Sequence, residues 1–161
     1  MIRANQQCLG QAVRLLDLLG DAQYASPRGQ WSAVGAQLRH VIEHYQCFLE
    51  GLDQGRIDYD ARRRDPIIET SRERARTVLR ELSDRIGRIP TEGVVSVQMR
   101  CAADAKDPTW SESSIGRELQ FLVSHSVHHF ALIKFLLAGD DLALDPDFGM
   151  APSTLAHRVS S

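Results

Sequence analysis

With 161 residues, the chain is long enough to form a single domain, residues 1–161, around one hydrophobic core without disulfides or metal staples. Its 19 basic and 21 acidic side chains give a formal charge of -2, which excludes a strong attraction to polyanions, so we expect no nucleic acid and no membrane among its partners. Its three cysteines, Cys8, Cys47 and Cys101, are scattered without a CxxC pair, which predicts reduced thiols and a cytoplasmic location.

The first two helices are predicted from the spacing of apolar residues. Residues 2–19 carry apolar side chains at intervals of three and four, which predicts an amphipathic helix that Gly20 ends. Polar residues interrupt this stripe, so it lacks the continuous apolar run of a signal peptide or membrane span. Residues 21–30 contain a proline and turn formers, so we expect a loop there. A second helix is predicted to run from Ser32, its N-cap, to about residue 55.

The middle of the chain alternates between irregular and helical patterns. The charged residues 56–65 show no consistent period, so we expect them to form a connection. Pro66 suits the first position of a third helix, which is predicted to end near Gly87. Residues 94–99 are rich in valine and favour a short extended piece. A long connection or a short hairpin is therefore expected before the last long helix.

The last long helix follows this extended piece and completes the predicted architecture. Either Ser113 or Ser114 is its N-cap, and Gly139 marks its end. The tail contains two prolines and one short predicted helix that begins at Ser153. Because helical patterns dominate, the sequence predicts an all-α bundle.

Histidines are the most informative residues, because five of the six lie in two short clusters, each within a predicted helix. Positions four apart on a helix differ by about 40° around its axis and rise about 6 Å, so His125 and His129 can share a metal ion. The other helix offers His40 and His44, one turn apart, as the source of a third ligand. His128 is the alternative to His129, although its direction differs by about 100°.

Three imidazole ligands indicate a divalent transition metal. We expect zinc or nickel first, and iron or manganese after them. Three protein ligands leave a coordination position open for water or substrate, which is typical of catalytic sites. The pattern is not the HExxH motif of zincin proteases, because Ser126 stands where that motif needs its glutamate. The alternative is that these are ordinary hydrogen-bonded helical histidines, since a single HxxxH pair arises often by chance.

These motifs resemble those of the DinB-like family, which includes the YfiT-like metal-dependent hydrolases and bacterial thiol S-transferases. The resemblance covers most of the chain and rests on the stretch WSAVGAQLRHVIEH and on HSVHH followed by FALI. It implies an up-down-down-up four-helix bundle and a metal site made of His40, His125 and His129. One departure is Leu132-Ile133, where many members of the family have Gln-Ile.

The resemblance also implies an activity. The expected protein is a metal-dependent hydrolase or thiol S-transferase that acts on a small molecule of unidentified structure, with a low-molecular-weight thiol as a second cofactor in the latter case. A homodimer is expected as its assembly. The alternative is a metal-binding or ligand-binding helical bundle without catalysis.

Polar neighbours of the histidines are further candidates. Glu118 lies seven residues before His125 on nearly the same helical face and is the predicted catalytic base; the alternative is a buried salt bridge with an arginine such as Arg64 or Arg62. Gln37 lies three residues before His40, and His44 lies four residues after it. Both are predicted to orient a ligand or bind the cofactor, and the alternative is ordinary hydrogen bonding.

A run of three arginines, residues 62–64, follows Tyr59 in the predicted connection. Such a run can receive a carboxylate or phosphate of a substrate. The alternative is a solvated linker whose arginines pair with the nearby acids Asp60, Asp65 and Glu69.

Overall fold

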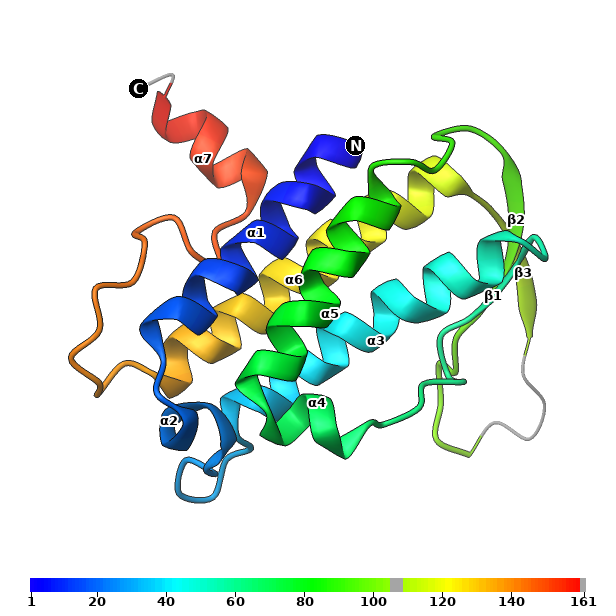
Figure 1. Cartoon of the computed structure of the whole chain (residues 1–161). Coiled ribbons are helices and arrows are strands. Elements are labelled where there is room, and N and C mark those ends of the chain that lie inside the picture. The colour runs from blue at the N-terminus through cyan, green and yellow to red at the C-terminus, as the bar shows by residue number, and fades with distance from the viewer. Residues whose placement is uncertain (105–108, 160–161) are drawn as a thin grey trace.

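The computed structural model describes residues 1–104 and 109–159, and within these ranges the chain forms seven helices and three strands (Figure 1). The helices are α1 (Ile2–Leu18), α2 (Asp21–Ala25), α3 (Val34–Leu52), α4 (Pro66–Thr70), α5 (Arg72–Ile86), α6 (Ile115–Leu136) and α7 (Pro152–Val159). The strands are β1 (Arg56–Asp58), β2 (Val94–Gln98) and β3 (Trp110–Ser114). Residues 105–108 of the predicted connection before α6 lie outside the described residues.

A mixed sheet corrects the predicted fold class. β2 lies in the centre, parallel to β1 and antiparallel to β3. The prediction of an all-α, up-down-down-up four-helix bundle is therefore wrong. The physical reason is that β1 has three residues and gains its hydrogen bonds from a partner far along the chain, with Arg56 opposite Ser96. β3 is largely exposed and polar, so it too lacks the apolar alternation that marks a strand.

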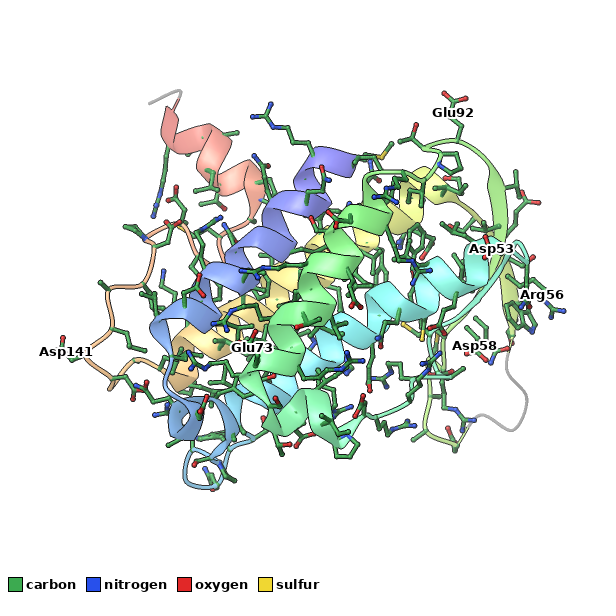
Figure 2. All side chains as sticks on the ribbon, viewed as in Figure 1. Asp53, Arg56, Asp58, Glu73, Glu92 and Asp141 are labelled. Carbon is green, nitrogen blue, oxygen red and sulfur yellow. The ribbon has the colours of Figure 1, made fainter. Side chains whose placement is uncertain are left out.

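The long helices α1, α3, α5 and α6 pack against one another around one hydrophobic core (Figure 1). Each contributes an apolar face; fully buried examples are Leu16, Phe48, Leu79 and Leu122. Charged side chains such as Glu73, Glu92 and Asp141 lie on the outside (Figure 2). Among the described helices, none combines the length and apolar character that a membrane span requires.

Three predicted boundaries also change. Ser32 is not the N-cap of α3; the N-cap is Ala33. The Ser32 hydroxyl instead accepts a hydrogen bond from the Gln37 amide. The predicted third helix is interrupted at Ser71, whose extended backbone separates α4 from α5. Residues 21–25, predicted to be part of a loop, form α2. All three differences arise from local backbone turns that periodicity over longer windows does not resolve.

Two junctions position the functional site. β3 ends at Ser114, whose side chain accepts a hydrogen bond from the Arg117 amide at 3.1 Å and so caps α6, which selects between the two predicted caps. At the end of α3, a Cβ on Gly51 would lie 2.4 Å from the main-chain oxygen of Arg56. Gly51 therefore permits the close approach by which β1 and the connection after it fold back along α3.

Candidate metal centre

Four histidines face one another between α3 and α6. His40 and His44 come from α3, and His125 and His129 come from α6. Ring centroids of contacting pairs lie between 4.0 Å, for His44 and His125, and 5.0 Å, for His40 and His125. The cluster forms because α3 and α6 pack side by side and each presents histidines one turn apart on its facing side.

Three of these histidines have the geometry of a ligand set. Ligand nitrogens of His40, His125 and His129 lie within 4.8 Å of one another, and all three side chains are partly exposed. These are the residues that the family resemblance implies. His44, which is buried and whose Nδ1 donates to the main-chain oxygen of His40 at 2.7 Å, lies beside this triad and is not part of it.

The side chains present fit a transition metal. The Nε2 atom of His125 is buried and has no hydrogen-bond partner among the described residues. Leaving a buried polar atom unpaired costs free energy, so such an atom calls for a ligand, an ion or a water molecule. Imidazole nitrogens are ligands that zinc and nickel accept. The three imidazoles and the unpaired nitrogen of His125 are therefore both compatible with a bound zinc or nickel ion.

Gln37 orients one of the three histidines. The Nδ1 of His129 donates to the side-chain oxygen of Gln37 at 2.7 Å, and the Gln37 amide donates to the hydroxyl of Ser32 at 2.8 Å. Because an amide oxygen can only accept, His129 carries its proton on Nδ1, and Nε2 keeps the lone pair. Metal-binding histidines commonly have such a partner on the second nitrogen. Gln37 therefore contacts a histidine of the triad, and its role in orienting a metal ligand stays a prediction.

Burial keeps the four histidines neutral. Desolvation is the largest cause that lowers their pKa values, to about 2 for His40, about 3 for His125 and about 4 for His44 and His129. Neighbouring histidines and the Arg62 guanidinium also lower these pKa values, and no carboxylate of the described residues raises them. At neutral pH the rings therefore have the protonation state that binds metal ions.

Arg62 is the arginine that the structure brings to the histidines. Its Nη1 donates to the Nδ1 of His40, and its Nε donates to the main-chain oxygen of Tyr59 at 3.1 Å. Within the described part of the chain, Arg62 forms no ion pair with a carboxylate. Arg63 is different, because it is exposed and pairs with Glu50 at 2.8 Å. The sequence showed the basic run but not which member faces the site, which depends on how the connection folds back along α3.

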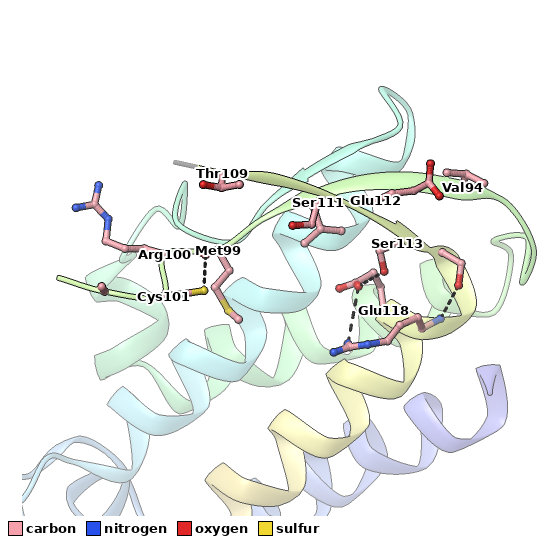
Figure 3. A pocket seen from close by; sticks show the side chains of 13 residues that line it. Val94, Met99, Arg100, Cys101, Thr109, Ser111, Glu112, Ser113 and Glu118 are labelled. Carbon is pink, nitrogen blue, oxygen red and sulfur yellow. Dashed lines mark hydrogen bonds and ion pairs between the residues drawn. The ribbon is translucent and has the colours of Figure 1, made fainter. Parts of the chain in front are cut away.

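Glu118 belongs to a separate group near the sheet. Its carboxylate accepts from the Tyr59 hydroxyl at 2.9 Å and from the Ser113 hydroxyl at 2.6 Å; Figure 3 shows it beside Ser113. Glu118 does form an ion pair with an arginine, as the alternative expected, but the partner is Arg117, at 3.8 Å, and not Arg62 or Arg64. The Tyr59 ring stacks on His44 with centroids 5.5 Å apart and is the link between this group and the histidines.

Glu118 also lines a cavity of about 820 Å³ beneath β2 and β3 (Figure 3). None of the four clustered histidines lines this cavity, so Glu118 borders a space that the triad does not. Two histidines are not among the four that face one another: His128 is exposed on α6, with its ring centroid 5.2 Å from that of His129, and His157 is exposed on α7. Cys47 is buried, and desolvation raises the pKa of its thiol to about 11, so it is not a thiolate at neutral pH.

Comparisons with known proteins leave the family open. No protein-family model matches the chain, and no solved structure matches it significantly. A stretch of 46 residues is 46% identical to FK506-binding protein 5 of Rhizopus delemar. That stretch covers 29% of this chain and 12% of the fungal protein. A match of this extent does not assign the chain to a family.

Proposed function

We propose that this chain is a divalent-metal-dependent enzyme of the DinB-like family, either a hydrolase or a thiol S-transferase, with His40, His125 and His129 as its metal ligands. The observation that carries the proposal is the triad itself, whose nitrogens lie within 4.8 Å of one another. The unpaired Nε2 of His125 supports it, because a metal ion would use that nitrogen. Zinc and nickel are the metals that suit this donor set best.

The chain's own residues prepare the site for such an ion. Burial holds the rings neutral, and Gln37 fixes the ring of His129 with its Nε2 lone pair available. Three protein ligands leave a fourth position for a small molecule. When bound, the ion supplies Lewis acidity, which lowers the pKa of water or of a thiol and so provides a nucleophile at neutral pH.

The nucleophile is proposed to come from outside the chain. Cys47 is the cysteine nearest in sequence to the histidines of α3, and the pKa of its thiol is raised to about 11 by burial. A thiol with this pKa is almost entirely protonated at neutral pH and reacts slowly. Water, for hydrolysis, or a low-molecular-weight thiol, for transfer, fills this role in the proposal.

Turnover by the metal-loaded protein tests the proposal. The protein, loaded with zinc or nickel, is screened against esters, amides and electrophiles offered together with thiols. We expect turnover that disappears in His125→Ala and persists in His128→Ala, which changes an exposed histidine on the same helix. Turnover that survives removal of the metal contradicts the proposal. Metal binding without turnover on any panel would instead favour a non-catalytic metal-binding protein.

A further inference from the structure

The contact between Arg62 and His40 conflicts with metal binding by His40. A neutral imidazole has one nitrogen with a lone pair and one that carries hydrogen. Because Arg62 donates to Nδ1, the lone pair of His40 lies on Nδ1 and the hydrogen on Nε2. A ligand bond through Nδ1 uses the same lone pair. A ligand bond through Nε2 moves the hydrogen to Nδ1, where it faces the guanidinium.

His40 therefore cannot bind a metal ion and accept from Arg62 at the same time. When His40 becomes a ligand, Nη1 of Arg62 loses its partner, while Nε remains held by the main-chain oxygen of Tyr59 at 3.1 Å. This second hydrogen bond keeps the guanidinium beside the histidines. Its two terminal nitrogens are then available, and they present the fork that matches the two oxygens of a carboxylate or a phosphate.

Charge balance indicates what those nitrogens bind. In the described part of the chain no carboxylate pairs with Arg62, and none is among the groups that shift the pKa values of the four histidines. A half-buried guanidinium beside neutral rings and a divalent ion leaves the loaded site strongly positive. Such a site favours an anion over a neutral molecule of the same shape.

We propose that Arg62 leaves His40 when the metal binds and then pairs with an oxyanion group of the substrate, a carboxylate or a phosphate. The proposal rests on the proposed function, since it requires a metal at the triad. It adds the substrate class, an anionic small molecule, and it makes Arg62 a binding residue of that substrate.

Zinc titration tests the first half of the proposal. Wild type, Arg62→Met and Arg63→Met are titrated with zinc by calorimetry in the presence of a competing chelator. Losing a hydrogen bond to a charged group corresponds to about tenfold in affinity, so we expect Arg62→Met to bind zinc about tenfold more tightly than wild type. Arg63→Met is the matched control, because Arg63 is exposed and pairs with Glu50, and it should bind like wild type.

Anion titration tests the second half. Methylphosphonate and acetate are titrated separately into the zinc-loaded proteins, so that the two arms distinguish a phosphate from a carboxylate. We expect at least one of them to bind wild type, and to bind Arg62→Met about tenfold more weakly. The metal-free wild type should also bind that anion more weakly, because Arg62 is then engaged with His40.

A measurement on wild type alone guards against a variant that folds poorly. Arginine side-chain NMR signals are followed during the zinc titration and then during the anion titration. We expect both additions to shift the signal of Arg62, which is assigned from its loss in Arg62→Met.

Each outcome separates the two proposals. If wild type takes up zinc, but Arg62→Met binds zinc no more tightly or binds both anions as well as wild type does, the inference about Arg62 is overturned and the metal site stands. Failure of both anions to bind loaded wild type also overturns it. If wild type takes up no zinc, both the metal site and the role of Arg62 fail.

Discussion

Two groups of polar side chains contact α6, about two turns apart, and they differ in how their hydrogen bonds are satisfied. The Glu118 carboxylate accepts from Tyr59, just after β1, and from Ser113 in β3. In the histidine cluster, Nε2 of His125 has no partner and Arg62 has no carboxylate, within the part of the chain that the structure describes.

We interpret this difference as the one between a structural group and the proposed metal site. A buried carboxylate with its hydrogen bonds made stabilises the fold, and the contacts of Glu118 hold the start of α6 against the sheet. A cluster that leaves a buried nitrogen without a hydrogen-bond partner, and a guanidinium without a carboxylate, gains free energy of stabilisation when a ligand supplies the missing partners. We therefore expect substitutions in the histidine cluster to lower zinc affinity, and substitutions in the Glu118 group to lower the free energy of unfolding.

The largest effect is expected from His125→Ala, which removes one ligand of the triad. Loss of a partner that only orients a ligand costs about 10- to 100-fold in metal affinity, so loss of a ligand should cost more than about 100-fold. Zinc titration by calorimetry measures the change. His128→Ala, at an exposed position of α6, should bind zinc like wild type. Equal zinc binding by His125→Ala and wild type would show that the triad is not the site.

A smaller loss of zinc affinity is expected from Gln37→Leu. The ring of His129 loses the acceptor for its Nδ1 proton, so its orientation and its tautomer are no longer fixed. Zinc affinity should fall about 10- to 100-fold, with the free energy of unfolding of the metal-free protein nearly unchanged. Ser32→Ala should give a weaker loss in the same direction, because Ser32 holds the Gln37 amide. A Gln37→Leu protein with full zinc affinity would remove Gln37 from the site.

Glu118→Ala is expected to lower stability and to leave zinc affinity nearly unchanged. The buried Tyr59 hydroxyl loses its acceptor, which should lower the free energy of unfolding by about 1–3 kcal/mol in urea denaturation. Zinc affinity should stay close to that of wild type. The control is Glu112→Ala, an exposed glutamate of β3, whose effect on stability should lie within about 0.5 kcal/mol. A large loss of zinc affinity without a loss of stability would make Glu118 part of the metal site after all.

The smallest effect concerns pH and His44. Burial lowers the pKa of folded His44 to about 4, while the unfolded chain has an ordinary histidine pKa near 6.5. The unfolded state therefore binds the proton first as pH falls, and the stability present above pH 6.5 is progressively lost below it. Between pH 7 and pH 6 this loss is about 0.7 kcal/mol for one histidine.

Comparison of the metal-free wild type with His44→Gln at both pH values isolates this contribution. The variant should lose less stability between pH 7 and pH 6 than wild type does. An identical loss in both proteins would mean that His44 is protonated as readily in the folded as in the unfolded state.

Local sequence patterns predicted the α6 histidines of this site better than its other residues. Helix geometry is local, so the four-residue spacing of His125 and His129 determined that both lie on one face of α6. Which α3 histidine joins them was left open by the spacing and was chosen from the family resemblance. The extended piece expected at residues 94–99 forms β2, but the addition of β1 to a three-stranded sheet was missed because β1 is short and its pairing partner lies far along the chain. The position of Arg62 depends on that same fold-back of β1 along α3, so no local pattern contained it.

Metal content is the most direct test of the central claim, that His40, His125 and His129 bind one divalent metal ion. Untagged wild type and His129→Ala are incubated with zinc or nickel, freed of excess metal and analysed by mass spectrometry of the elements. We predict about one equivalent in wild type and less than about a tenth of an equivalent in His129→Ala. Less than about a tenth of an equivalent of either metal in wild type, or equal content in both proteins, would contradict the account.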